Sequence, residues 1–95
     1  MFYVYILYSS GFDKYYIGHT DHVRRRLTEH NEISENSFTS RYRPWQLASA
    51  FEIGPDRGMA MKVEKYLKKQ KSKAYIRDTI KRGNIDLVIK KCSVG

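Results

Sequence analysis

The chain has 95 residues, a formal net charge of +8 at pH 7 and one cysteine. This length allows one domain with a small core, so we expect residues 1–95 to form a single unit. The single cysteine excludes a disulfide within the chain and a cysteine-based zinc site. Lys and Arg exceed Asp and Glu by 18 to 10, which favours a polyanionic partner, most commonly nucleic acid.

The first predicted element is a strand over residues 2–8, which are mostly β-branched or aromatic. This apolar stretch is short, has no basic region before it and is followed by turn residues 9–11, which argues against a signal peptide or a membrane span. We therefore expect a cytoplasmic protein that does not enter a membrane. Because side chains alternate along a strand, Tyr3, Tyr5 and Leu7 should share one face, and the residues between them the other.

A turn leads to a second short strand over residues 14–19, which completes an antiparallel hairpin. Thr20 or Asp21 can cap a helix that runs to about residue 31. Residues 32–44 show little apolar periodicity and predict a long loop, which in a compact domain is usually functional or mobile.

A third strand is predicted over residues 45–53. A helix follows over residues 57–69, and another begins after Ser72 as its cap and closes at Gly83. Residues 84–92 predict either a tail strand or an extended packing arm. The order β-β-α-β-α-α plus a C-terminal tail predicts an α+β fold, with a small three-stranded, mostly antiparallel sheet flanked by helices.

The first predicted helix carries two polar residues that can face the sheet. Val23 and Leu27 form its apolar stripe, and Arg26 and His30 flank that stripe at positions i and i+4. Of the arginines at residues 24–26, Arg26 is therefore the one whose guanidinium can reach the sheet. A solvent-facing charge run is the alternative, and it suits the other two arginines better.

Glu64 is the only acid among residues 57–77 and lies beside the apolar stripe of the second predicted helix. A lone carboxylate in a basic surface has two interpretations: an ion pair with Lys68 at i+4, or a ligand for a divalent metal next to phosphate. Tyr5 and Tyr16 belong to neighbouring strands, so their hydroxyls can approach each other, or the rings can simply pack in the core.

Together these residues resemble the GIY-YIG nuclease superfamily across essentially the whole chain. Residues 3–5 read Tyr-Val-Tyr in place of Gly-Ile-Tyr, and residues 16–18 read Tyr-Ile-Gly. The chain is most similar to the small stand-alone bacterial members, and it also resembles the N-terminal domain of the excision-repair incision subunit. His19 stands where small hydroxyl residues are common, so it is either a proton partner or a surface residue.

The resemblance implies a catalytic set of two tyrosines, an arginine, a histidine and a glutamate: Tyr5, Tyr16, Arg26, His30 and Glu64. Gly18 would be the motif glycine, where the backbone leaves the strand unobstructed. Asn31 would complete the His-Asn pair of the small bacterial members.

Each catalytic residue type has an implied role. Glu64 would hold a single Mg²⁺ or Mn²⁺ ion, and Arg26 would bind the scissile phosphate through its fork of donors. Tyr5 would act as general base or relay for the attacking water, while Tyr16 and His30 orient water and phosphate.

The implied activity is metal-dependent hydrolysis of phosphodiester bonds in DNA, in repair or recombination. We expect selectivity for DNA structure rather than sequence, since no helix resembles a recognition helix with base-reading side chains. Two alternatives stay open: a non-catalytic nucleic-acid-binding module of the same fold, and an RNA-acting nuclease. Because a domain of this size offers little surface for recognising a substrate, a protein partner or a dimer is a plausible means of directing it to its substrate.

A basic surface is expected to hold the phosphate backbone. Its candidates are Lys and Arg residues outside the catalytic set: Arg24, Arg25, Arg41, Arg43, Lys65, Lys68, Lys69 and Lys73. Tyr42 and Trp45 can stack on an unpaired base, although Trp45 also suits the core at the start of a strand.

Overall fold

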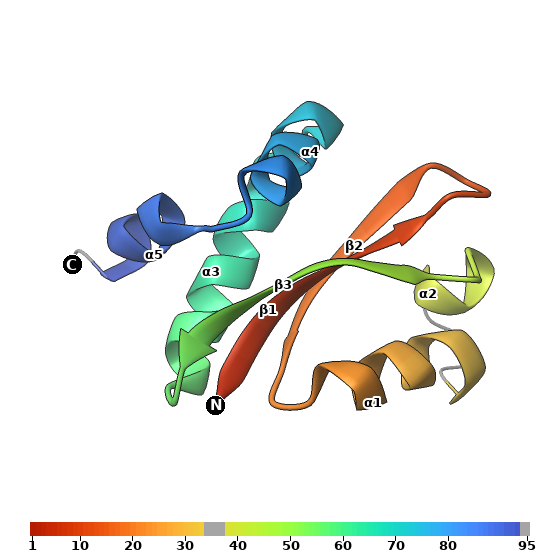
Figure 1. The fold of residues 1–95 in the computed structure, drawn as a ribbon, viewed down its shortest axis with the longest axis horizontal. Helices are drawn as coiled ribbons and strands as arrows, with labels where there is room; N and C mark the ends of the chain where they lie inside the picture. The colour runs from red at the N-terminus through yellow and green to blue at the C-terminus, as the bar shows by residue number, and fades with distance from the viewer. Residues whose placement is uncertain (34–37, 94–95) are drawn as a thin grey trace.

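The computed structural model describes residues 1–33 and 38–93, which form an antiparallel sheet with helices on both faces (Figure 1). The elements in chain order are β1 (Phe2–Ser9), β2 (Lys14–Thr20), α1 (Val23–Thr28), the π-helix η1 (Glu29–Ile33), α2 (Phe38–Arg41), β3 (Gln46–Gly54), α3 (Arg57–Lys69), α4 (Lys73–Arg82) and α5 (Asp86–Ser93). The three-stranded sheet and this order confirm the predicted α+β class.

β1 is the central strand of the sheet, whose order is β2-β1-β3 with both neighbours antiparallel. The hairpin turns after Ser9, where the amide of Phe12 donates to the carbonyl of Ser9 and Asp13 has a φ of 51°. The resulting register places Tyr5 directly opposite Gly18.

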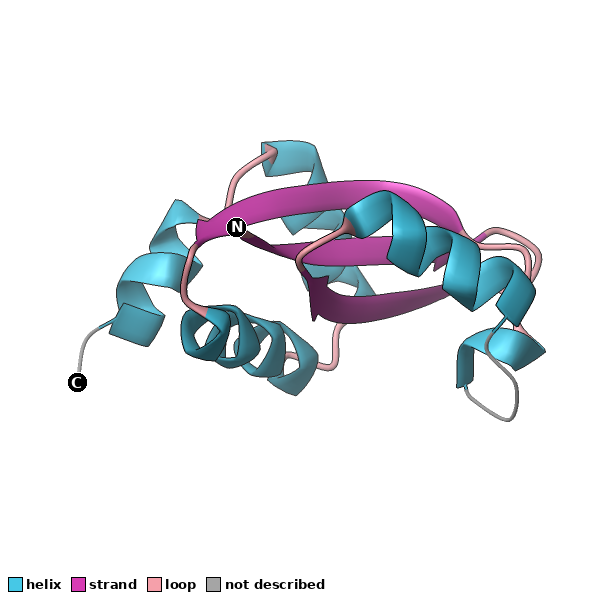
Figure 2. Cartoon of the chain, turned by 90° about the horizontal axis from the view of Figure 1, so that it is seen from below, coloured by secondary structure: helices cyan, strands magenta, loops and turns pink. Residues whose placement is uncertain are grey.

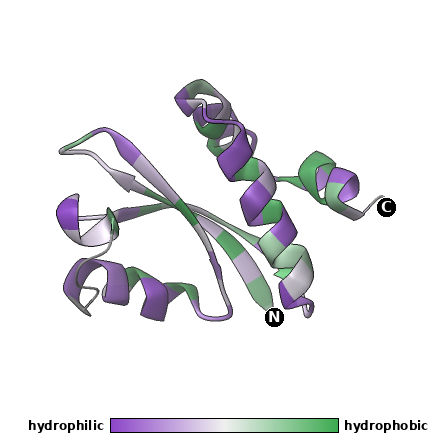
Figure 3. Cartoon of the chain, turned by 180° about the vertical axis from the view of Figure 1, so that it is seen from behind, coloured by the Kyte–Doolittle hydropathy of each residue, from purple (hydrophilic) through white to green (hydrophobic). Residues whose placement is uncertain are grey.

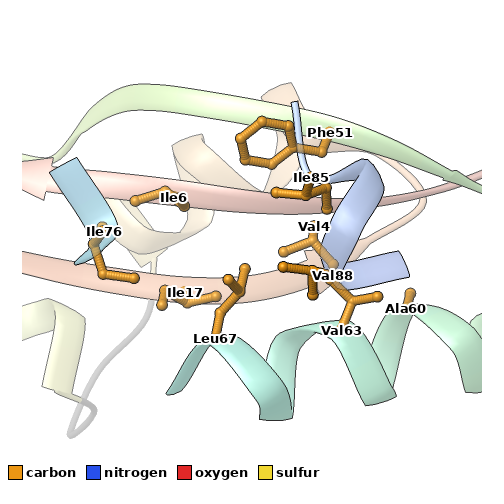
Figure 4. Packing of buried hydrophobic residues seen from close by; sticks show 10 residues of the cluster. All are labelled: Val4, Ile6, Ile17, Phe51, Ala60, Val63, Leu67, Ile76, Ile85 and Val88. Carbon is orange, nitrogen blue, oxygen red and sulfur yellow. The ribbon is translucent and has the colours of Figure 1, made fainter. Parts of the chain in front are cut away.

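One face of the sheet packs against α3, α4 and α5 through the larger hydrophobic core (Figure 4). Val63 and Leu67, one helical turn apart on α3, point toward Val4 and Ile6 of β1 and toward Ile17 of β2. This packing confirms the alternation predicted for β1 and the apolar stripe predicted for α3.

The opposite face of β1 is buried as well. Tyr5 and Leu7 pack with Trp45 in a second cluster, which α1 covers with Val23 and Leu27. Figure 2 shows the resulting layers, with the sheet between α1 and α3. A central strand buried on both faces explains why the first strand is almost continuously apolar.

Hydropathy follows the same layers. Figure 3 shows hydrophobic residues along β1 and on one side of α3, whereas α1 and η1 are mostly hydrophilic. Within residues 1–33 and 38–93, no helix combines the length and apolar character that a bilayer span requires.

The predicted limits of α3 and α4 are confirmed by their caps. Asp56 accepts a hydrogen bond from the amide of Gly58 at 2.8 Å, and Ser72 accepts one from the amide of Tyr75 at 3.1 Å. Gly83 ends α4 with a φ of 78°, a left-handed conformation that glycine adopts without steric cost.

The predicted cap of the first helix was wrong. The N-cap is His22, not Thr20 or Asp21, and its Nδ1 accepts a hydrogen bond from the amide of Arg25 at 3.1 Å. Thr20 instead accepts from the amide of His22 at 3.1 Å and so turns the chain before the helix begins.

The loop predicted over residues 32–44 is partly helical. The α-helix ends at Thr28, the wide turn η1 continues to residue 33, and α2 adds one more turn. Residues 34–37 lie outside the described part of the chain. One-turn elements bury few side chains, so they leave no apolar period in the sequence.

The predicted C-terminal strand or extended arm was also wrong, because these residues form α5. Ile85 and Val88 are buried three residues apart, and Ile89 and Cys92 pack partly buried beside them. Leu87 lies on the other side and is 61% exposed. This spacing is helical, but a short apolar run such as Leu-Val-Ile is compatible with either structure.

Candidate active site

Tyr5 projects from the centre of the sheet across the edge strand β2. Its ring passes over Gly18, where a Cβ atom would lie 2.4 Å from Tyr5 Oη and 2.6 Å from Cζ. No side chain larger than hydrogen fits there. Gly18 lies inside β2, which continues to Thr20, so its role is to give space to Tyr5 rather than to let the backbone leave the strand.

His30 meets Tyr5 on the α1 side of the sheet. It is 2% exposed, its Nε2 lies 2.8 Å from Tyr5 Oη, and its Nδ1 lies 2.9 Å from Thr39 Oγ1. The ring of Tyr16 lies with its centroid 4.8 Å from that of His30 and 6.3 Å from that of Tyr5. Three predicted site residues therefore form one aromatic cluster, in which Tyr5 and His30 are hydrogen-bonded and Tyr16 packs against both rings. We call it the tyrosine–histidine cluster (Tyr5, Tyr16 and His30).

Burial favours the neutral forms of Tyr5 and His30. Desolvation raises the pKa of Tyr5 to about 12, with Tyr16 adding to the rise and Arg26 opposing it. Desolvation also lowers the pKa of His30 to about 4, with a further contribution from the positive charge of Arg26. Near neutral pH the phenol is protonated and the imidazole is uncharged, because each charged form would have to be buried.

Arg26 supplies positive charge beside this cluster. Its Nη1 donates to Glu29 Oε1 at 2.9 Å, and the side chain remains partly exposed. Glu29 is the main cause of the raised pKa of Arg26, and interaction with Tyr5 adds to it. The contact with Arg26 in turn lowers the pKa of Glu29. Glu29 thus helps to fix the guanidinium next to the Tyr5 hydroxyl.

Two side chains attach η1 to the start of β3. Asn31 donates from Nδ2 to the carbonyl of Trp45 at 3.0 Å and accepts from the Trp45 amide at 2.6 Å. Arg43 donates from Nε to the carbonyl of His30 at 2.7 Å. A π-helical turn departs from the regular α-helical hydrogen-bond pattern, and such turns are frequent at functional sites. Asn31 and Arg43 therefore hold the backbone that carries His30.

Glu64 lies on the other side of β2, where α3 packs. Its Oε1 lies 2.7 Å from His19 Nδ1, and its Oε2 accepts from Lys68 Nζ at 2.8 Å. The side chains of Glu64 and His19 are each 20% exposed. They line a cleft of about 550 Å³ together with Lys65 and Lys68. We call Glu64, His19 and Lys68 the carboxylate cluster.

Lys68 connects the two clusters. While its Nζ is bonded to Glu64, it also lies 5.7 Å from the centroid of the Tyr16 ring. Glu64 is close enough to Tyr5 to contribute to its raised pKa. The arrangement therefore brings all five predicted catalytic residues to the two sides of one short segment of β2.

The comparison with known families agrees with this geometry. A sequence model described as the GIY-YIG catalytic domain matches residues 1–77, which include both clusters. The chain is a member of the GIY-YIG family. No curated protein matches it closely enough to count as a relative.

Beside and within the two clusters of this GIY-YIG chain lie residues whose contacts the sequence did not reveal. Thr39 follows His30 by nine residues, across a segment with no periodic signal, and its contact depends on how α2 folds back. Glu29 stands at i+3 from Arg26, a spacing that could have predicted their ion pair. His19 was left between a proton partner and a surface residue; its contact with Glu64 identifies it as a partner of the carboxylate.

The basic residues proposed for nucleic-acid binding differ in exposure and pairing. Arg43 is partly buried and donates to the His30 carbonyl. Arg24, Lys65 and Lys69 are exposed. Arg25 is also exposed, but it forms an ion pair with Asp21. Lys68 forms an ion pair with Glu64, and Lys73 forms one with Asp13. Arg41 is exposed at the end of α2. Their contacts with nucleic acid stay a prediction.

Glu64 is a carboxylate, the type of donor that a single hard cation uses. In the described residues, no three or more His, Cys, Asp or Glu side chains gather so as to enclose a metal. Mg²⁺ commonly binds one or two carboxylates and completes its octahedron with substrate phosphate and water. Glu64 offers one carboxylate at an open cleft, where His19 Nδ1 contacts its Oε1 and Lys68 Nζ contacts its Oε2.

Proposed function

We propose that this GIY-YIG chain is a metal-dependent endonuclease that hydrolyses phosphodiester bonds in DNA. The observation that carries the proposal is the 2.8 Å contact between Tyr5 Oη and His30 Nε2, next to Arg26 and across β2 from Glu64. The contact supports the proposal because a phenol, a guanidinium and a carboxylate then surround one short segment of chain, as candidates for proton acceptor, phosphate ligand and metal holder. Phosphodiester hydrolysis requires these three functions.

Tyr5 is the proposed general base. Since burial raises the pKa of Tyr5 to about 12, the phenol must first release its proton to base in the solvent before it can take one from the attacking water. Both nitrogens of His30 are hydrogen-bonded, so a neutral imidazole can donate Nε2–H to the phenolate while Nδ1 accepts from the Thr39 hydroxyl. The positive charge of Arg26 also favours the phenolate.

Arg26 is the proposed ligand of the scissile phosphate. A guanidinium binds phosphate through a planar fork of donors and stays charged at any physiological pH. The described contact with Glu29 uses Nη1 and holds the side chain in place without burying it. Tyr16 packs against His30 and is proposed to orient the water and the phosphate.

Glu64 is the proposed holder of a single Mg²⁺ or Mn²⁺ ion. When bound, such an ion supplies positive charge beside a non-bridging phosphate oxygen and the leaving oxygen. His19 Nδ1 contacts Oε1 of the same carboxylate and is proposed to fix its orientation.

Selectivity is proposed to follow DNA structure rather than sequence, with a role in repair or recombination. α1 and α3 face the sheet with their apolar residues and present mainly Lys and Arg outward, side chains that contact phosphates rather than read base edges. A protein partner or a second copy is a proposed source of targeting.

A cleavage assay tests the function directly. End-labelled single-stranded, duplex, flap and four-way-junction DNA would be incubated with Mg²⁺, Mn²⁺ or a chelator. We expect metal-dependent cutting that Glu64→Ala and Arg26→Ala each reduce by at least about 10²-fold, while DNA binding largely remains. Glu52→Ala and Arg82→Ala, which change an exposed acid and an exposed arginine elsewhere, are the matched controls.

If either site variant cuts at the wild-type rate, the site assignment is wrong. If the wild type binds DNA without cutting any substrate, the alternative of a non-catalytic binding module is favoured. Cutting of RNA alone would favour the RNA-acting alternative.

A further inference from the structure

A basic groove with an aromatic wall lies next to the tyrosine–histidine cluster. It has a volume of about 340 Å³ and runs between β2, α2 and the junction of α3 and α4. Phe38 and Tyr16 belong to its lining, with ring centroids 6.3 Å apart and planes inclined by 25°. The same lining contains four lysines and no acid: Lys14, Lys68, Lys71 and Lys73. Two of them are paired with acids outside the lining, Lys68 with Glu64 and Lys73 with Asp13.

The aromatic residue that reaches solvent here is Phe38. Its side chain is 46% exposed, although transfer of a phenyl ring out of water is energetically favourable. Trp45, predicted as a candidate for stacking on a base, is only 3% exposed, and its indole N–H donates to the Thr39 carbonyl at 2.7 Å. Trp45 instead lies behind Phe38, with ring centroids 6.1 Å apart, and Tyr42 packs 4.8 Å from Phe38 on another side.

Phe38 is therefore an exposed ring on a packed aromatic base, facing a groove lined by positive charge. Aromatic faces of this kind stack on unpaired bases, and nearby lysines neutralise the phosphates of the same strand. A base inside a duplex cannot use such a site, because it is already stacked and paired. The groove thus suits a single strand and not a continuous duplex.

We propose that this groove binds an unpaired nucleotide of a single-stranded DNA segment adjoining the scissile phosphate. Tyr16 connects the two regions, because it lines the groove and also contacts His30 in the tyrosine–histidine cluster. Lys68 does the same on the other side, since it lines the groove and pairs with Glu64. This inference rests on the proposed nuclease function and assigns its substrate: DNA that carries a single-stranded arm beside the cut.

Binding measurements in the presence of a chelator test the groove independently of catalysis. The probes would be a blunt duplex and the same duplex with a single-stranded arm that carries 2-aminopurine at its first unpaired position. We expect Phe38→Ala to weaken binding of the armed duplex by about 5- to 100-fold, the effect of losing one stacked base. Binding of the blunt duplex should change by less than about twofold, and the 2-aminopurine fluorescence quenched by wild type should recover.

Matched variants separate stacking from folding. Phe38→Tyr keeps an aromatic face and should retain binding. Leu87→Ala truncates an even more exposed apolar side chain on the distant α5 and should change the binding of neither probe. Lys71→Glu adds a test of the charge, with an expected loss for the armed duplex that diminishes as salt is raised. Circular dichroism spectra confirm that each variant is folded.

The proposal for the groove is overturned if Phe38→Ala weakens binding of both probes equally or weakens binding of neither. Cleavage by the wild type with Mg²⁺ is scored separately. Arm binding that depends on Phe38 without any cleavage retains the groove and refutes the nuclease. Cleavage of armed DNA that is unaffected by Phe38→Ala retains the nuclease and refutes the groove.

Discussion

The two sides of β2 hold chemically different parts of the proposed site. On the α1 side, the tyrosine–histidine cluster is packed and internally hydrogen-bonded. On the α3 side, the carboxylate cluster is charged and opens onto a cleft. Its members Glu64 and His19 keep a fifth of their side-chain surface in solvent.

The difference follows from the cost of burying charge. Neutral groups can be buried if their hydrogen bonds are satisfied, whereas an ionised group is costly to desolvate unless it is paired. The buried side is therefore suited to control of a proton, with the pKa of Tyr5 raised and that of His30 lowered. The open side is suited to exchange ions and phosphate with solvent.

The largest expected effect comes from removing one oxygen on the buried side. Tyr5→Phe keeps the ring, but it deletes the proposed base and should lower kcat by about 10²- to 10⁴-fold. In the wild type, kcat at saturating metal should rise about tenfold per pH unit between about pH 6 and 9. The phenolate fraction grows in this range because the pKa of Tyr5 is raised to about 12.

Tyr3→Phe, on the same strand and face, serves as the control and should cut at the wild-type rate. A flat pH profile combined with an active Tyr5→Phe variant would show that the base lies elsewhere, for example in the carboxylate cluster.

The next prediction tests whether activity requires the close approach of the Tyr5 ring to Gly18 in β2. Gly18→Ala places a Cβ 2.4 Å from Tyr5 Oη, so the ring must shift. We expect a 10- to 100-fold loss of kcat, at about the level of a 1 Å misplacement, and destabilisation by about 1–3 kcal/mol. Gly11→Ala has no atom within 4 Å of its new Cβ and should change neither property.

Urea unfolding and single-turnover cleavage measure the two quantities on the same samples. A fully active Gly18→Ala protein would mean that Tyr5 need not lie across β2.

A smaller effect is expected on the open side. His19→Asn removes the partner of Glu64 Oε1, so we expect a roughly tenfold increase in the metal concentration needed for half-maximal cleavage. His22→Asn is the same substitution at an exposed position, where asparagine is a good helix cap and metal dependence should be unchanged. An unaltered metal requirement in His19→Asn would make His19 a surface residue.

The last effect concerns stability alone and tests whether the His30 imidazole is neutral in the folded protein. The folded pKa of His30 is about 4, below the unfolded value near 6.5, so the unfolded state binds the proton more readily between these values. Stability should therefore fall as pH drops from about 6.5 to 4, with His30 contributing at most about 1.4 kcal/mol per pH unit. His30→Gln should lose that part of the slope in urea unfolding.

Carboxylates titrate in the same range in both proteins, so the difference between wild type and variant isolates the histidine. Identical slopes would show that the imidazole is not held neutral by burial.

The sequence by itself determined the strands, the long helices and the candidates for the catalytic set. Alternation in β1, the stripe of Val63 and Leu67 and the caps Asp56 and Ser72 are local signals, because they depend on side-chain period and on hydrogen bonds within one turn. The two tyrosine motifs together with Arg26, His30 and Glu64 were predictable through their resemblance to a family.

Only the tertiary structure decided how these residues are held. Thr39 reaches His30 because α2 folds back over η1, and His19 reaches Glu64 across 45 residues of chain. Phe38 replaces Trp45 as the exposed ring because the start of β3 buries the tryptophan. Such contacts join segments with no shared period, so their free energies depend on packing between elements. Only the folded chain brings those elements together.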